Sequence, residues 1–220
     1  MSLAMLERLS RAFGRRSAEG TLAWHPPALL DQGRIGAARL AMDRHGKGLA
    51  LWENGGQLWS MEQGVGSPRA LVRLPVAGGQ DPRVVLDPQG RGSALWTAAD
   101  ADGAVLMGRP LSRSQTLAHE LFATRGRIHH LQAAVDRRGS VLAVWCHELD
   151  GRFEVLAQCF DTRTGEWERR PAQLGPRFPR ARGLGLAMNL RGHAMVVMPA
   201  DDERFRGLVC CHYWPTDRIW

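Results

Sequence analysis

The sequence predicts an all-β fold made of four similar antiparallel sheets, and three observations predict it. A motif recurs four times, short apolar runs flank each copy, and turns rich in Gly and Pro separate the runs. The 220 residues are 44% hydrophobic and 23% charged, which is the composition of a folded protein with a substantial core. The 25 Gly and 12 Pro indicate many short elements joined by tight turns.

The recurring motif is Asp/Asn-x-x-Gly-x-x-x-(Ala/Val)-x-(Trp/Met), and we call its first residue the anchor. The anchors are Asp43, Asp87, Asp136 and Asn189, which lie 44, 49 and 53 residues apart. Periods of this size are typical of propeller blades or solenoid units. The four units therefore account for most of the chain.

Each anchor is predicted to lie in a turn between two strands, because one apolar run ends at it and another follows it. An Asp side chain can accept hydrogen bonds from backbone NH groups two residues on, and Gly supplies the positive φ of a tight turn. These roles explain both residues without catalysis or a metal. First strands are predicted at 38–42, 83–86, 132–135 and 185–188, and second strands at 49–52, 94–96, 141–145 and 194–198.

A polar turn and a third run complete the pattern in every unit, and a less regular fourth strand follows in three of them. The third strands are predicted at 58–61, 104–108, 153–160 and 208–213, and the fourth at 70–76, 116–122 and, most clearly, 167–174. Each unit is therefore a four-stranded antiparallel meander. The last unit lacks a fourth strand.

Residues 21–30 repeat the pattern of 167–174, so we expect the N-terminal strand to complete the last sheet and close a ring. The alternative is that two chains join as an eight-bladed ring. Closure within one chain is favoured, because an intramolecular pairing costs less entropy. The domain organisation is then an extension at 1–20 and a β-propeller at 21–220.

The repeat resembles the blades of bacterial β-propellers of the sialidase-like or BNR-like type, in which an apolar strand, an Asp/Asn-x-x-Gly turn and an Ala-x-Trp strand recur. The resemblance covers about 21–220 and concerns architecture. The Asp-box of sialidases, Ser-x-Asp-x-Gly-x-x-Trp, is not matched, since Trp falls six residues after Gly. The sialidase arginine triad and catalytic Tyr have no counterparts, and Tyr213 is the only Tyr. The resemblance therefore implies a fold and no activity.

The formal net charge is +7, and Arg supplies all but one of the 29 basic residues. The positive charge is concentrated in residues 1–16 and 161–191, while the rest of the chain is nearly neutral. Nucleic acid is not an expected partner, because few aromatic residues accompany the second cluster and no stacking platform is visible.

The four cysteines show no spacing typical of a zinc site, and we expect them to be small core residues. Adjacent Cys210 and Cys211 should point to opposite faces of a strand, which argues against a disulfide between them. The N-terminus has no continuous apolar stretch of the kind that a secretory signal contains. A cytoplasmic location is expected, either peripheral to a membrane or within a larger complex.

Residues 1–20 have the pattern of a basic amphipathic helix. Such a helix could lie on an anionic membrane, dock in a groove of a partner, or pack on its own propeller. The residues predicted to dock are Leu6, Arg8, Leu9, Arg11 and Phe13.

A binding face is predicted where the second-to-third strand turns meet the loops that enter each first strand. In extended chain, adjacent His129 and His130 should point apart and could not chelate one metal as a simple pair. No catalytic motif, metal site or cofactor site is recognised. The predicted partner-binding residues are Arg127, His129, His130, Glu148, Asp150, Arg180 and Arg182.

The function predicted from these observations is a non-catalytic propeller that serves as a scaffold or interaction module for a protein partner. The alternative is a glycan-binding propeller lectin, with a glycosidase as the weaker form of that alternative. The recurring Trp52, Trp96 and Trp145 could line glycan pockets, but their place on an inner strand is more typical of core residues.

Overall fold

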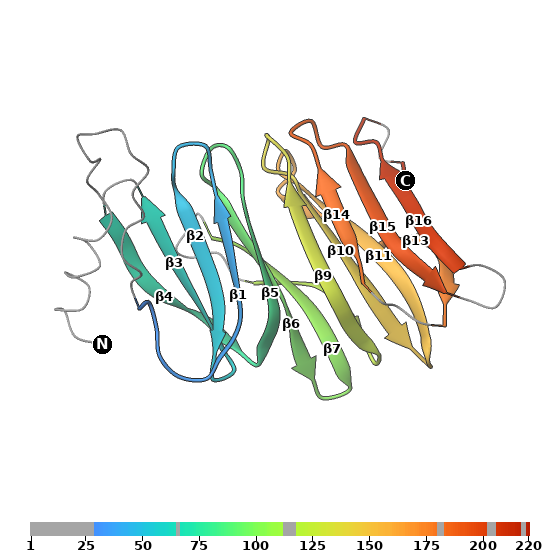
Figure 1. Ribbon diagram of the computed structural model, residues 1–220, viewed down its shortest axis with the longest axis horizontal. Coiled ribbons are helices and arrows are strands. Elements are labelled where there is room, and N and C mark those ends of the chain that lie inside the picture. The colour runs from blue at the N-terminus through green and yellow to red at the C-terminus, as the bar shows by residue number, and fades with distance from the viewer. Residues whose placement is uncertain (1–28, 65–66, 112–117, 180–182, 202–205, 217–218) are drawn as a thin grey trace.

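The computed structural model describes residues 29–64, 67–111, 118–179, 183–201, 206–216 and 219–220, and these form antiparallel β-sheets (Figure 1). The first sheet has the order β1 (Ile35–Met42), β2 (Gly48–Asn54), β3 (Gln57–Gly64) and β4 (Ser67–Ala77). The second has β5 (Gly79–Leu86), β6 (Gly92–Asp100), β7 (Gly103–Pro110) and β8 (His119–Thr124). The third contains β9 (Arg127–Val135), β10 (Val141–Leu149), β11 (Arg152–Asp161), β12 (Glu166–Trp167) and β13 (Ala172–Phe178), and the fourth β14 (Gly185–Met188), β15 (Ala194–Asp201) and β16 (Arg206–Tyr213).

The prediction of four four-stranded sheets is correct for the first two sheets and wrong for the third, and the fourth sheet is not four-stranded within the described residues. In the third sheet the single strand predicted at 167–174 is divided into β12 and β13, which both pair with β11. Pro171 lies in the interruption, where a strand would lack an NH donor. The fourth sheet has three strands among the described residues. The predicted helix at 1–20 and residues 21–28 of the predicted closing strand lie outside the described residues.

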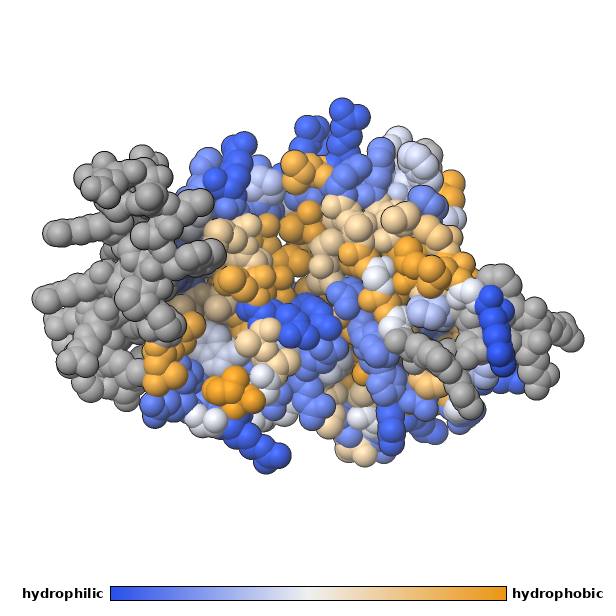
Figure 2. All heavy atoms as spheres, viewed as in Figure 1, coloured by the Kyte–Doolittle hydropathy of each residue, from blue (hydrophilic) through white to orange (hydrophobic). Residues whose placement is uncertain are grey.

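The four sheets follow one another in a row, and the first and fourth sheets lie at its opposite ends (Figure 1). The first strands of successive sheets pack in the order β1 with β5, β5 with β9, and β9 with β14. The described residues thus form an open row of propeller blades, and the predicted ring within one chain is not formed by them. Figure 2 shows hydrophobic residues gathered mostly along the middle of the row and hydrophilic residues at the two ends of the strands.

The anchor turns confirm the role predicted for the repeated Asp or Asn. Oδ1 of Asp87 accepts hydrogen bonds from the backbone NH groups of Gln89 and Arg91, at 2.9 and 2.8 Å, and the other three anchors bond the residues two and four positions on in the same way. The motif Gly has a positive φ in every unit. Local hydrogen bonding therefore explains the spacing of the anchor and its Gly.

The anchor turns also contact one another, which the sequence did not predict. A Cβ on Gly139 would lie 2.7 Å from Oδ2 of Asp87, the anchor of the preceding sheet. Nζ of Lys47 donates to the carbonyl of Gly90 at 2.6 Å, and Nη2 of Arg91 donates to the carbonyl of Arg138 at 2.6 Å. The residue four positions after the anchor thus links each of the first two turns to the next.

Three apolar layers hold the row together, one at each junction between sheets. Trp52, Trp96 and Trp145 are buried, which confirms the prediction that they fill the core. Cys146 is also buried, and burial raises the pKa of its thiol to about 11. Cys211 packs against the apolar layer between the third and fourth sheets, whereas Cys210 is exposed, so the two thiols point to opposite faces as predicted. The prediction that Cys210 is a core residue is wrong.

Candidate functional site

The predicted binding face lies at one end of the third sheet, and we call this end the loop face. Strands β9 and β10 bring Arg127 opposite Glu148 in register. Nε2 of His129 lies 2.8 Å from Oε2 of Glu148, with both side chains about one-third exposed. Asp150 occupies the exposed turn between β10 and β11, whereas Arg180 and Arg182 lie outside the described residues.

A backbone irregularity reorients the two adjacent histidines. His130 has a φ of 53°, and the pairing of β9 with β10 shifts register at this point. The expectation that the two side chains point apart in extended chain is therefore wrong, because the bulge breaks the alternation. The rings of His129 and His130 lie 6.2 Å apart between centroids. His130 lies six residues before the anchor Asp136, and Asp81 lies six residues before the anchor Asp87. Asp81 has a φ of 44°, so the positive φ recurs at the same position in the second sheet.

His147 lies beyond the predicted end of the second strand at residue 145, but in the structure it is inside β10 and buried. Its Nε2 lies 2.7 Å from Oγ1 of Thr124, at the end of β8, and its Nδ1 lies 2.9 Å from Oε1 of Glu154 in β11. Arg177 in β13 donates from Nε to Oε2 of Glu154 at 2.8 Å. This network joins four strands of two sheets, and no local sequence signal marks it.

The donors and acceptors of this network are compatible with a neutral His147 between Thr124 and Glu154. Gly126 donates its backbone NH to Oγ1 of Thr124 at 2.9 Å, and the hydroxyl can then donate to Nε2 of His147. In this tautomer Nδ1 of His147 carries the ring proton and donates a hydrogen bond to Oε1 of Glu154. Burial opposes ionisation of Glu154, but the hydrogen bonds from His147 and Arg177 and the positive charge of Arg177 outweigh it and hold its pKa below the usual value.

A small cavity of about 260 Å³ opens beside this network on the loop face. Its lining has charges of both signs and comprises His147, Leu149, Asp150, Arg152, Glu154 and Arg177. The order hydroxyl, imidazole and carboxylate resembles that of a hydrolase triad. However, Thr124 does not line the cavity, so its hydroxyl is not presented to a substrate there. The arrangement instead holds Glu154 and Arg177 at the cavity wall.

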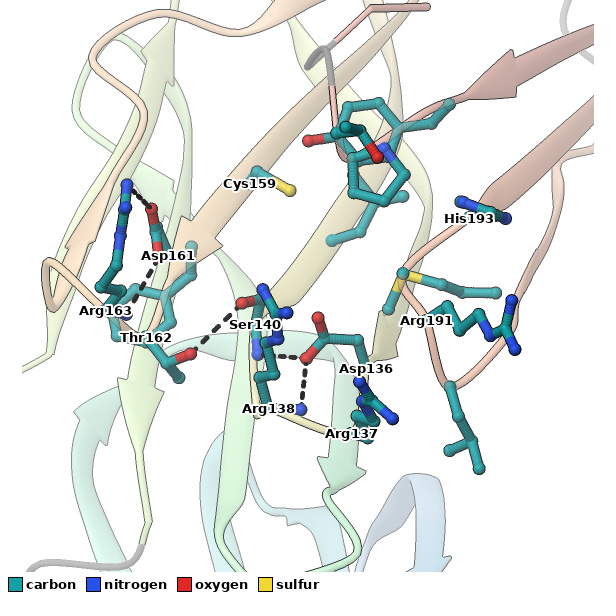
Figure 3. A pocket seen from close by; sticks show the side chains of 18 of the residues that line it. Asp136, Arg137, Arg138, Ser140, Cys159, Asp161, Thr162, Arg163, Arg191 and His193 are labelled. Carbon is teal, nitrogen blue, oxygen red and sulfur yellow. Dashed lines mark hydrogen bonds and ion pairs between the residues drawn. The ribbon is translucent and has the colours of Figure 1, made fainter.

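A larger cavity of about 650 Å³ lies at the opposite end of the strands, between the anchor turns of the third and fourth sheets (Figure 3). At this junction the residue four positions after the anchor is Ser140, whose hydroxyl lies 3.2 Å from that of Thr162. The side-chain link made by Lys47 and Arg91 at the other junctions is therefore missing. Arg138 and Arg191 line the open space.

Neither a metal-binding cluster nor a membrane-spanning helix occurs in the part of the chain that the structure describes. No group of three or more His, Cys, Asp and Glu side chains there is arranged to hold a metal ion. None of the described residues forms a helix of the length and apolarity needed to span a membrane.

Comparisons with known proteins support the fold and identify no family. No protein-family model matches the sequence, and no curated protein is significantly similar to it. Among solved structures, the chain is similar to an endo-arabinase from Bacteroides thetaiotaomicron, with a TM-score of 0.50 and 12% identity over 84% of this chain and 76% of the arabinase. It is also similar to the Dos1 propeller (TM-score 0.47, 9% identity, 74% and 42% covered) and to the NanB sialidase of Streptococcus pneumoniae (TM-score 0.47, 11% identity, 78% and 28% covered).

The class that the successive antiparallel sheets define is the β-propeller fold, and the similarity to the arabinase supports it. The chain spans about three quarters of the arabinase, but less than half of the Dos1 propeller and of the sialidase chain. At identities near 10%, the likeness concerns the fold alone, and no activity follows from it.

Proposed function

We propose that this protein is a non-catalytic propeller-type interaction module that binds a protein partner through the loop face of its third sheet. The observation that carries the proposal is the group of charged side chains around the 260 Å³ cavity, where Asp150 and Arg152 lie beside the fixed pair of Glu154 and Arg177. A surface with fixed charges of both signs suits recognition of another polar protein surface, because complementary charges select the partner and its register.

Two further observations support a functional role for this face. Both ring nitrogens of His147 are engaged by neighbours, so the buried imidazole is a positioning group. The strained backbone of His130, at the edge of the same face, is a feature found often at binding sites. A cytoplasmic location, peripheral to a membrane or within a larger complex, remains part of the proposal.

The glycan-binding alternative depended on tryptophans presented between blades. Trp52, Trp96 and Trp145 are 5%, 0% and 0% exposed, so these rings offer no stacking surface to a sugar. We therefore do not advance a lectin or glycosidase function.

The test is affinity capture from a lysate of the native host with the full chain and two variants. Arg152→Glu reverses a charge at the loop-face cavity, and Arg138→Glu makes the same change at the opposite end of the strands. We expect the wild type and Arg138→Glu to recover the same specific protein and Arg152→Glu to lose it. Equal recovery by both variants, or no specific protein with the wild type, would refute the loop-face proposal.

A further inference from the structure

Each interior junction of the row uses the same two kinds of sheet face. The forward face of a sheet consists of alternate residues of its second strand, six and eight positions after the anchor, and their neighbours on the third strand. In the third sheet it includes Leu142, Val144 and Val155, which pack against Val196 and Met198 of the fourth sheet. We call the opposite side of a sheet its backward face, and in the fourth sheet it carries Val196 and Met198. The backward face of each following sheet thus covers the forward face of the preceding sheet.

The forward face of the fourth sheet is apolar but has no covering sheet among the described residues. Val155 lies opposite Cys146 in the third sheet, and Leu208 lies opposite Pro199 at the same repeat position in the fourth. The residues that correspond to Leu208 are Leu58, Leu106 and Val155, which are 0%, 0% and 3% exposed, whereas Leu208 is 68% exposed. Met195, which corresponds to the buried Leu142, is 42% exposed on the same face.

The backward face of the first sheet is also uncovered at two positions, whereas Trp52 on the same face is buried and donates to Asp31. Leu40 and Met42 lie opposite Ala50 and Gly48, on the side of β1 away from the second sheet. They are 68% and 64% exposed. The corresponding residues of the second sheet, Val84 and Leu86, are 9% and 8% exposed, because the forward face of the first sheet covers them.

We propose that a second copy of this chain covers both faces, with the forward face of the fourth sheet of each copy packed on the backward face of the first sheet of the other. The match is specific, because the exposed side chains occupy the repeat positions that are buried at the interior junctions. Two such junctions would close eight sheets around a twofold axis, which is within the usual range of propellers. The docking uses the ends of the row and is independent of the loop-face function.

The test is the solution mass of the full chain and of two variants, measured by light scattering with a reducing agent present because Cys210 is exposed. Leu40→Glu places a charge on the backward face, and Leu208→Glu places one on the forward face. We expect the wild type to have twice the chain mass of 24.4 kDa and each variant alone to have the mass of one chain. Leu149→Glu, a change at an exposed Leu of the loop face, should remain a dimer.

Mixing the two variants distinguishes head-to-tail docking from other pairings. In the mixture, the unsubstituted forward face of the Leu40→Glu chain can pack on the unsubstituted backward face of the Leu208→Glu chain. One junction then contains no introduced Glu, so we expect the mass of a dimer. A wild type with the mass of one chain would overturn the proposal. So would a dimer of either variant alone, or a mixture that stays monomeric.

Discussion

Replacement of Trp145 by Ala tests the packing between the second and third sheets. The side chain is fully buried, and its ring lies 5.5 Å from that of Phe122 between centroids. A buried Trp removes roughly 150–250 Å² from water. At about 25 cal/mol per Å², this burial is worth roughly 4–6 kcal/mol.

The indole nitrogen of Trp145 reduces this value, because Nε1 has no hydrogen-bond partner within the described part of the chain. An unsatisfied buried donor costs about 1–3 kcal/mol, which the substitution would recover. The cavity left behind adds a cost in the opposite direction. We therefore expect Trp145→Ala to lower the free energy of unfolding by about 3–5 kcal/mol, as is usual for large core truncations.

Urea unfolding followed by tryptophan fluorescence and circular dichroism measures this loss. Trp145→Phe keeps an aromatic ring and removes the unpaired NH, so it should cost less than about 1.5 kcal/mol. Trp214→Ala is a control at a half-exposed ring and should change stability by about 0.5 kcal/mol. A loss below about 1 kcal/mol for Trp145→Ala would refute the packing described for this junction.

Three other predictions concern the anchor turns and the buried network. Asp87→Asn should lower the free energy of unfolding by about 1–3 kcal/mol, because it weakens the 2.6 Å contact of Oδ2 with Nε of Arg91. Asp136→Asn should cost less, since no described side chain makes such a contact with that carboxylate, and urea unfolding of both variants would contradict this if the order were reversed. Gly139→Ala should lower the free energy of unfolding by about 3 kcal/mol and Gly165→Ala by about 1 kcal/mol, because both residues have a positive φ but only Gly139 faces a neighbouring carboxylate. Equal thermal unfolding midpoints of the two variants would count against the contact between turns. Glu154→Gln should destabilise the protein most at neutral pH, because the pKa of Glu154 is lowered in the folded state. Such a carboxyl stabilises the fold above its unfolded pKa of roughly 4.3 and loses this contribution as pH falls through the folded pKa. A difference in unfolding free energy between wild type and variant that grows from pH 7 to pH 3 would show that Glu154 is not held as a carboxylate.

The sequence was sufficient to predict the hairpin at each anchor, because Asp or Asn followed three residues later by Gly determines a turn through local bonds. It was also sufficient to predict the burial of Trp96 and Trp145, which follow from alternation along a strand. Strand ends were less predictable. The second strand of the third unit continues from the predicted Trp145 to Leu149, because pairing with β11 extends it through polar residues.

The candidate site was only partly predictable, because its contacts join residues far apart in the chain. His129 and Glu148 were placed on one face from topology alone, and the structure brings them to 2.8 Å. The contact of His147 with Thr124 depends on how two sheets pack, which no local pattern encodes. The bulge at His130 was missed because a positive φ in a residue other than Gly has no clear sequence signal.

The contact of each anchor turn with the next has a consequence for how the protein loses structure. An interior sheet is stabilised by two neighbours, whereas each end sheet of the row has one, as in other linear repeat proteins. In a single undocked copy, such as the Leu208→Glu variant, amide exchange should therefore be fastest in the first and fourth sheets and slowest in the strands around Trp96 and Trp145. If two copies dock end to end, every sheet has two neighbours, and the difference in amide exchange between end and interior sheets should disappear. The end sheets are then protected from local unfolding by the partner copy.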